Sequence, residues 1–183
     1  FSFSNTFSIS ASVFSEFSEQ ANSTCFKKLS SASIPCLAYL FNEIANEWDT
    51  PDKIESSKLF AGKIKEHIKS FDKPVDILDF GCGTGLIAYE FIDQASKLVG
   101  IDTSKGMLEV FGQKGEGLGK VETHLLNLEE SDLNQKFDLI VTSTAFHHLN
   151  DPQKMTQKLF GMLNEGGQLA VVDLDKEDGS FHP

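Results

Sequence analysis

The chain contains no arginine: its 16 basic residues are all lysines, set against 27 aspartates and glutamates, and the formal net charge is -11. Proteins that hold nucleic-acid backbones rely on basic clusters and on the bidentate guanidinium fork of arginine. We therefore expect no nucleic-acid partner. A strongly acidic surface mainly favours solubility.

Cysteine is also scarce, with Cys25, Cys36 and Cys82 as the whole set. Their spacing matches no zinc-binding pattern and no disulfide framework, so the sequence predicts no metal site and a reducing compartment. The cytoplasm is the expected location, with an organelle as the alternative.

Long apolar runs are missing too. The run from Ile34 to Phe41 contains Pro35 and is far shorter than the roughly 18 residues of a membrane span, so no such span is expected. The start lacks the basic and apolar regions of a secretory signal. Its serine content suits a transit peptide, but the missing arginines and the acidic Glu16 and Glu19 speak against one.

At 183 residues the chain is long enough for one domain with a proper core. Residues 1–36 are rich in serine and phenylalanine and carry few charges, which predicts disorder or a segment outside the domain. We expect the domain itself to occupy residues 37–183. Because the chain begins with Phe1 rather than methionine, we also expect it to be a fragment, a processed product or the product of an incomplete gene model.

From residue 51 onward, short apolar strands alternate with stretches of helical periodicity. This alternation predicts an α/β fold with a parallel sheet and helices on both faces. Gly166 and Gly167 are expected to end the last helix. The predicted strands are 75–80, 97–101, 121–126, 137–143 and 169–174, and the predicted helices are 51–70, 88–95, 104–111 and 151–165.

Polar or glycine-rich residues follow four of these strands. A glycine segment follows the first strand, Asp102 the second, Asn127 the third and residues 143–148 the fourth. In open parallel sheets, ligands bind at the carboxyl ends of the strands, where the strand order reverses. We therefore expect these four features to converge on one site.

The glycine segment reads Val-Asp-Ile-Leu-Asp-Phe-Gly-Cys-Gly-Thr-Gly over residues 75–85. Glycines allow unusual dihedrals and a close approach of backbone to ligand, and the following helix start favours an anionic group. The spacing is G-x-G-x-G, with Leu86 where a dinucleotide fingerprint has its last glycine. A second G-x-G-x-G at residues 115–119 follows a helix and is read as a flexible loop.

Two carboxylates flank the glycine segment. Asp102, 21 residues after Gly81, suits a carboxylate that accepts hydrogen bonds from ribose hydroxyls, with a helix N-cap as the alternative. Asp79 precedes the turn and either orders the loop or attracts a cationic ligand, or does both. Cys82 is read as a small side chain in a tight turn rather than a reactive thiol.

These segments together resemble the class I S-adenosylmethionine-dependent methyltransferases. Residues 76–85 look like the family's first motif, 98–108 like its second-strand segment, and 137–141 and 163–169 like its later motifs. His147-His148-Leu149 with Asp151-Pro152 resembles the small-molecule branch that includes ubiquinone and menaquinone methyltransferases. The resemblance covers about residues 40–183 and implies a Rossmann-like sheet of order 3-2-1-4-5.

The resemblance also implies S-adenosyl-L-methionine as cofactor and a set of residues that bind it. The glycine-loop backbone would approach its methionine part and Asp102 its ribose, while Met107 and Asn127 would lie near the adenine. Asn127 stands where the family usually has an acidic residue, and a plain turn residue is the alternative. The implied cofactor-binding set is Asp79, Gly81, Cys82, Gly83, Gly85, Asp102, Thr103, Met107, Asn127 and Leu128.

For catalysis, the resemblance implies in-line methyl transfer to a small-molecule acceptor. His147 and His148 rank equally as candidate bases, with packing or pocket lining as the alternative. Phe41 and Trp48 are candidates for a lid over the site. Asp173 and Asp175 are read as solvated turn residues rather than pocket carboxylates.

The family's sheet normally continues with two further strands, which we expect to be absent here. Their absence would leave the last strand, residues 169–172, as an exposed edge. A truncated, catalytically silent cofactor-binding module is therefore the alternative function. A nicotinamide-dependent oxidoreductase ranks lower, because Leu86 breaks its fingerprint.

Overall fold

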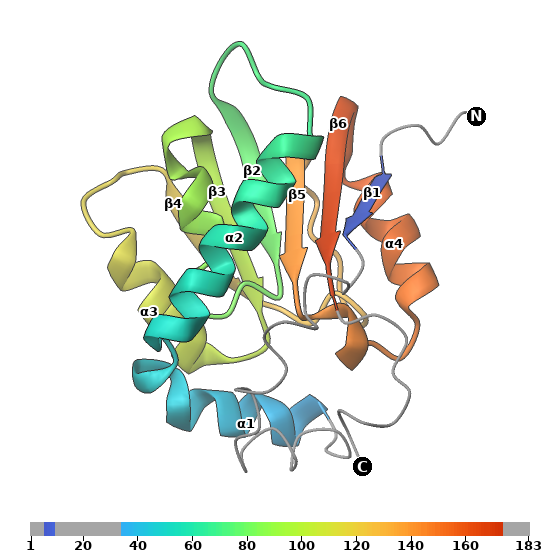
Figure 1. Cartoon of the computed structure of the whole chain (residues 1–183). Helices are drawn as coiled ribbons and strands as arrows, with labels where there is room; N and C mark the ends of the chain where they lie inside the picture. Colours follow the sequence, from blue (N-terminus) through green and yellow to red (C-terminus); the bar gives the residue numbers. More distant parts are fainter. Residues whose placement is uncertain (1–5, 10–33, 174–183) are drawn as a thin grey trace.

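The computed structural model describes residues 6–9 and 34–173 of the chain. Their strands form one sheet in which every pairing is parallel, in the order β1-β6-β5-β2-β3-β4 (Figure 1). The strands are β1 (Thr6–Ile9), β2 (Val75–Phe80), β3 (Ala95–Asp102), β4 (Val121–Leu125), β5 (Phe137–Ser143) and β6 (Leu163–Val172).

The predicted fold class and strand order are confirmed. From β2 the chain runs outward through β3 to β4, then returns to add β5 and β6 on the other side of β2. The strand order therefore reverses between β2 and β5, which is where open α/β sheets form their ligand crevice.

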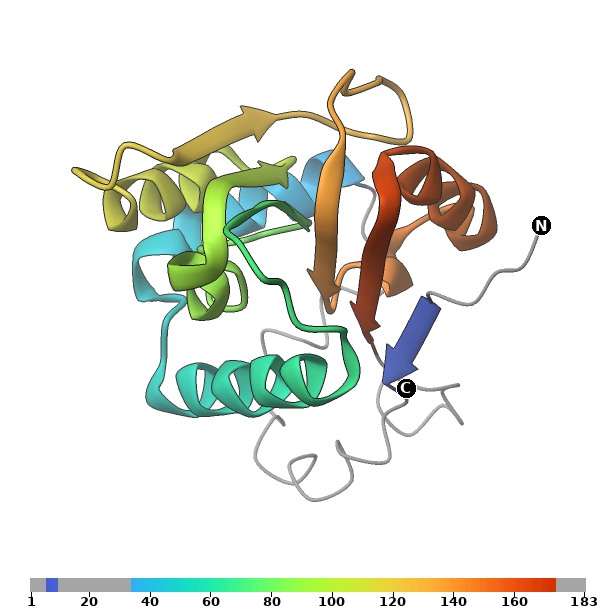
Figure 2. The same ribbon diagram turned by 90° about the horizontal axis from the view of Figure 1, so that it is seen from above.

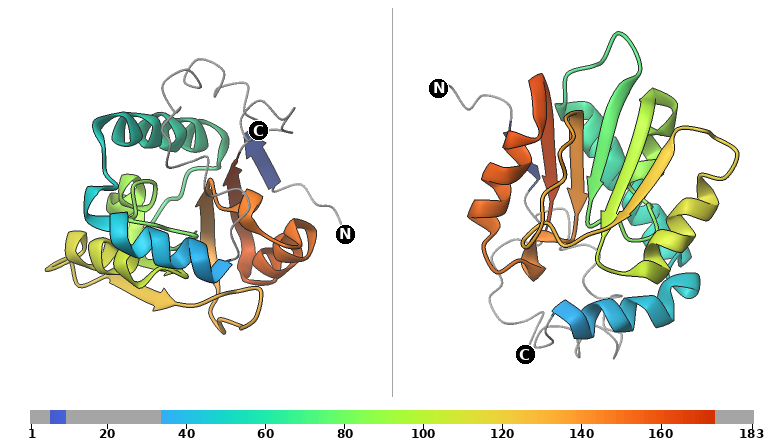
Figure 3. Two further views of the ribbon diagram at one scale, coloured as in Figure 1. Left: turned by 90° about the horizontal axis from the view of Figure 1, so that it is seen from below. Right: turned by 180° about the vertical axis from the view of Figure 1, so that it is seen from behind.

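Helices cover both faces of the sheet. Seen from above, α2 lies on one side of the sheet and α4 on the other (Figure 2), and the view from behind shows α4 lying over the strands (Figure 3). The helices are α1 (Ile34–Ile44), α2 (Pro51–His67), α3 (Lys105–Lys114) and α4 (Pro152–Gly161), with 3-10 turns η3 (Ala45–Glu47), η4 (Ala88–Gln94) and η5 (Phe146–His148).

The core divides between the two faces according to the alternation of strand residues. In β2, Ile77 belongs to the cluster that includes Phe91 and Phe111, on the face of α2, η4 and α3. Its neighbour Leu78 belongs to the opposite cluster, with Met155 of α4. Burial on both faces fixes the strand register, because a slip of one residue would exchange the two clusters.

Helix α1 lies across the carboxyl ends of the strands rather than against either face (Figures 1 and 3). It thus borders the crevice that the strand order creates. Within the described part of the chain, no helix combines the length and apolar character that crossing a membrane would require.

Two local predictions were wrong. The turn after the glycine loop is the 3-10 helix η4, not an α-helix, and Ala95 already belongs to β3. The last helix ends at Gly161, and Gly166 and Gly167 lie inside β6.

The edge of β6 is not open along the length predicted. Strand β1 pairs with it from Thr6↔Leu169 to Ile9↔Val172, so the ladder groups facing outward there have partners. The division of the chain at residue 36 stays a prediction, since residues 1–5 and 10–33 lie outside the described residues, as does Asp175.

Candidate active site

The glycine loop begins at the carboxyl end of β2. The N–H groups of Gly81 and Cys82 both donate to the carbonyl of Ile101 in β3, at 2.9 and 3.0 Å. This pairing bends the chain over the neighbouring strand. Gly81, Gly83 and Gly85 have φ values of 68°, 51° and 84°, in the left-handed region that favours glycine.

The loop also touches the end of β5. A Cβ atom on Gly81 would lie 2.5 Å from Cβ of Ala145, closer than two carbon atoms approach without a shift of the backbone. Glycine at this position therefore lets the loops after β2 and β5 meet at the point where the strand order reverses.

Asp102 joins the second strand end to the glycine loop. Its Oδ2 accepts the Gly83 N–H and its Oδ1 accepts the Ser104 N–H, both at 2.8 Å. The pKa of this carboxyl group is raised, because burial outweighs the opposite effect of hydrogen bonds from the backbone N–H groups of Ser104, Gly83 and Thr103. A carboxylate has about four acceptor sites, more than these backbone groups fill, so Asp102 can also accept a bond from a ligand hydroxyl.

Asp79 is the second carboxylate of the site, and only 2 % of its surface is exposed. Burial raises its pKa well above the usual value, the charge of Asp102 raises it further, and a bond from the backbone of Ala88 acts in the opposite direction. A buried carboxylate beside a like charge is stabilised by a cationic ligand.

The thiol of Cys82 is buried between these groups, and burial raises its pKa well above the usual value. A thiol held neutral is a poor nucleophile. This supports its interpretation as a small side chain in a tight turn.

One cavity of about 210 Å³ connects these groups. Phe41 of α1 and Trp48 form part of its wall, with their rings edge to face and centroids 5.4 Å apart. The ammonium of Lys53 lies 3.3 Å from the centroid of the Trp48 ring, which holds the indole in place.

Two side chains fasten this wall to the glycine loop and to α3. Oδ1 of Asn42 in α1 accepts the hydroxyl of Ser104 at 2.8 Å and the Gly106 N–H at 2.7 Å. Helix α1 is thereby tied to the first turn of α3, immediately after Asp102.

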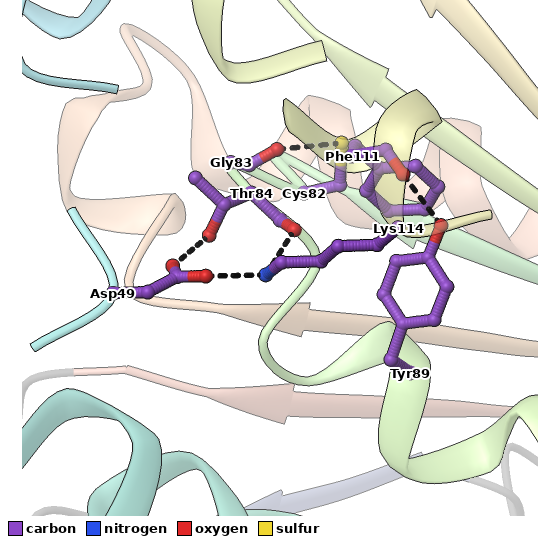
Figure 4. A network of polar contacts seen from close by, with 7 residues as sticks. All are labelled: Asp49, Cys82, Gly83, Thr84, Tyr89, Phe111 and Lys114. Carbon is purple, nitrogen blue, oxygen red and sulfur yellow. Dashed lines mark hydrogen bonds and ion pairs between the residues drawn. The ribbon is translucent and has the colours of Figure 1, made fainter. Parts of the chain in front are cut away.

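The second attachment is Asp49 (Figure 4), the residue that follows Trp48 in the sequence. Its Oδ1 accepts the hydroxyl of Thr84 in the glycine loop, and its Oδ2 pairs with the ammonium of Lys114, both at 2.5 Å. Lys114 also donates to the Thr84 carbonyl at 2.8 Å. We call these three residues the Asp49 clamp, because they connect the Trp48 segment, the glycine loop and the end of α3.

On the other side of the cavity, the loop after β4 contributes Asn127, Leu128 and Glu129 to the wall. Oδ1 of Asn127 accepts the Glu129 N–H at 3.0 Å, so this side chain also shapes its own turn. The Glu129 carboxylate accepts from the backbone N–H and the side-chain amide of Asn150, each at 2.9 Å. Glu129 therefore ties the loops after β4 and β5 together.

The loop after β5 shows local strain at the cavity wall. Thr144 has a φ of 53°, which is rare for a β-branched residue. Its N–H donates to the Val172 carbonyl at 2.8 Å, so pairing with β6 stabilises this conformation. Such outliers gather at functional sites, where the surroundings hold them in place.

The two histidines of η5 differ in position. His148 lines the cavity, with its ring centroid 6.4 Å from that of Phe41, whereas His147 is not part of the lining. His147 Nδ1 instead lies 2.7 Å from Oδ1 of Asp173. Asp173 is mostly buried, with 12 % of its side chain exposed, and so is not the solvated turn residue that we expected.

The structure brings the predicted residues together at the carboxyl ends of the strands. Of the predicted cofactor-binding set, only Gly85 is missing from the cavity lining, and its N–H donates to the Cys82 carbonyl at 2.8 Å within the loop. The lining includes Asp79, Gly81, Cys82, Gly83, Asp102, Thr103, Met107, Asn127 and Leu128. Sequence reasoning missed Asn42, Asp49, Thr84 and Lys114, which act through contacts between distant parts of the chain.

Comparison with known proteins gives a consistent result. Residues 77–167 match the family described as methyltransferase domain. The chain is 36 % identical over 118 residues to an uncharacterized methyltransferase of Schizosaccharomyces pombe, covering 59 % of the chain and 42 % of that protein. It is 31 % identical over 157 residues to a ubiquinone biosynthesis O-methyltransferase of Pelagibacter ubique, covering 77 % of the chain and 65 % of that protein.

Among solved structures, the DhpI-SAM-HEP complex superposes with a TM-score of 0.62 at 19 % identity, covering 77 % of this chain and 65 % of that one. This likeness concerns the fold. The chain spans less than two thirds of the length of the two methyltransferases compared by sequence above. On its motifs, strand order and sequence matches, the chain belongs to the class I S-adenosylmethionine-dependent methyltransferases.

Proposed function

We propose that the protein transfers a methyl group from S-adenosylmethionine to a small-molecule acceptor. The observation that carries this proposal is the joining of Asp102 to the Gly83 amide at the rim of a cavity that also contains Asp79. A carboxylate suited to ribose hydroxyls, a glycine-rich backbone loop and a buried acidic group occur together there.

The residues present fit this cofactor. Asp102 retains acceptor capacity for a ribose hydroxyl. Asp79 offers a buried negative charge to the ammonium or sulfonium group. None of the described residues that line the cavity is a lysine, so the cavity as described favours a cationic ligand over a polyanionic one such as a dinucleotide.

When bound, the cofactor supplies an already activated methyl group. The protein must then align the acceptor and exclude water. Phe41 and Trp48 contribute aromatic rings to the cavity wall, and apolar surface of this kind helps to keep water from the reacting groups. His148 is the imidazole on the cavity wall, and we assign it the role of accepting a proton from the acceptor atom.

Titration calorimetry with S-adenosylmethionine, S-adenosylhomocysteine and NAD tests the cofactor. We expect heat of binding with the first two and none with NAD. Asp102→Ala should weaken S-adenosylhomocysteine binding at least tenfold, which corresponds to about 1.4 kcal/mol. Asp72→Ala is the matched control, because Asp72 is exposed and precedes the amino end of β2. Absence of binding to either sulfur compound would overturn the proposal.

Transfer of tritiated methyl into a panel of lipophilic phenols and alcohols then separates an enzyme from a silent cofactor-binding module. Transfer above a no-acceptor control supports the enzyme. Binding of S-adenosylmethionine without transfer to any member of the panel would favour the silent module.

A further inference from the structure

Asp173 holds the turn that carries both histidines by means of both its carboxylate oxygens. Oδ2 accepts the backbone N–H of Phe146 at 2.6 Å, and Oδ1 contacts the His147 ring at 2.7 Å. One side chain at the end of β6 therefore fixes both the backbone of η5 and the orientation of an imidazole. Neither contact is visible in the sequence, where 26 residues separate His147 from Asp173.

The contact also determines which nitrogen of His147 carries the proton. An ionised carboxylate only accepts hydrogen bonds, so Nδ1 of His147 must donate, and in the neutral ring Nε2 is the acceptor. A buried carboxylate that orients an imidazole in this way fixes the tautomer as well as the position.

The His147 ring in turn contacts His148, the histidine that lines the cavity. Its ring centroid lies 3.9 Å from that of His148, with the rings inclined at 50°, and His148 lines the cavity beside Leu149 and Ala145. The His148 ring thus contacts both the His147 ring and the Phe41 ring.

We propose that Asp173 is a positioning residue, which fixes the tautomer of His147 and, through ring contact, the orientation of His148 on the wall of the cavity. The catalytic part of this role rests on the proposed function. In the reaction, the acceptor atom forms a bond to the methyl carbon and loses its proton to His148. The carbon–sulfur bond breaks, and its electron pair stays on sulfur.

A role for His148 as base implies an acceptor whose nucleophilic atom carries a proton at neutral pH. A hydroxyl group has this property, whereas a carboxylate is already ionised and needs no base. The pair of histidines therefore favours hydroxyl acceptors over carboxylate acceptors.

Long-range ¹H–¹⁵N spectra of the imidazoles test the proposal on the chain itself, with His147→Gln and His148→Gln for assignment. Wild type should show His147 with its proton on Nδ1. Asp173→Asn can still accept the Phe146 N–H, but its amide group must face the ring, so the proton should move to Nε2. Asp138→Asn is the control, since Asp138 likewise accepts one backbone N–H and one side-chain N–H, from Asp76 and Asn164.

Addition of S-adenosylhomocysteine should shift the His148 signals in wild type, and by a different amount in Asp173→Asn. A His147 proton on Nε2 in wild type, or an unchanged tautomer in Asp173→Asn, overturns the proposal. So does bound S-adenosylhomocysteine that leaves His148 unmoved. A failure of the ligand to bind at all counts against the proposed function alone, because the tautomer is read without it.

Discussion

The backbone N–H of Gly83 donates a 2.8 Å hydrogen bond to Oδ2 of Asp102. This bond joins the glycine loop after β2 to the end of β3 in the absence of a ligand. The other oxygen of Asp102 accepts the Ser104 N–H, which belongs to the start of α3. A ligand that binds Asp102 thus meets a glycine loop already in place, and little ordering is needed on binding.

Asp102→Asn should therefore loosen the glycine loop in the absence of ligand. An amide has one oxygen, so it cannot accept both the Gly83 and the Ser104 N–H without turning its NH₂ group toward one of them. We expect the amides of residues 81–86 to exchange hydrogen at least tenfold faster, measured by mass spectrometry, while Asp72→Asn leaves them unchanged. Equal exchange in the variant and the wild type would show that the loop is ordered without this bond.

Two glycine substitutions should change stability in opposite directions. Gly81→Ala combines a left-handed φ of 68° with a Cβ only 2.5 Å from that of Ala145. Strain and overpacking together should lower the free energy of unfolding by about 2–4 kcal/mol. Gly62→Ala lies in α2, with nothing within 4 Å of the added Cβ, and should raise it by about 0.5–1 kcal/mol.

Urea denaturation of the three proteins measures both effects. A stability loss of less than 1 kcal/mol in Gly81→Ala would mean that the loops after β2 and β5 separate at little cost, contrary to the close contact described here.

Asp79→Asn should bind the ligand more weakly than the wild type does, and it should be more stable than the wild type in the absence of ligand. Burial and the charge of Asp102 raise the Asp79 pKa in the folded protein above the unfolded value. The native state therefore holds its proton more tightly. This contribution to stability is fully present below the unfolded pKa, and it is lost as the pH rises through the folded pKa.

Removing the ionisable group should thus make the ligand-free variant more stable than wild type, by on the order of 1 kcal/mol at pH 8, with the difference shrinking toward acid pH. Thermal melts between pH 5 and pH 8 measure this difference. Calorimetry should show the reverse for ligand, with S-adenosylhomocysteine bound at least tenfold more weakly by the variant. A variant less stable than wild type at pH 8 would mean that the charge of Asp79 is stabilised within the folded protein.

The sequence was sufficient for those parts of the fold that local patterns determine. Apolar runs located β2 and β5 at their observed bounds, and the chain order of strands and helices implied the crevice. Asp102 could be predicted because its position follows from the end of one strand.

Contacts between distant segments could not be predicted in this way. Asn42 is 62 residues from its partner Ser104, and Asp49 is 35 residues from Thr84. No local pattern distinguishes such a side chain from a solvated one. The same holds for Asp173, whose burial beside His147 depends on the parallel pairing of β5 with β6.

The Asp49 clamp gives a final prediction, because it holds the only tryptophan of the chain, Trp48, against the cavity. The Lys114 ammonium bridges the Asp49 carboxylate and the Thr84 carbonyl (Figure 4). In Lys114→Met both oxygens lose a charged donor, at a cost of about 1–2 kcal/mol. The segment that carries Trp48 should then open more often.

Acrylamide quenching of the Trp48 fluorescence measures this opening, and we expect the quenching constant to rise about twofold in Lys114→Met. The matched control is Lys105→Met in the same helix, whose ion pair with Glu109 is exposed and 3.4 Å long and so contributes little. Salt should raise the quenching of wild type toward that of Lys114→Met, because ions screen the partly exposed pair. If the two lysine variants quench alike, the position of Trp48 depends on Asn42 and the packing of Phe41 rather than on the clamp.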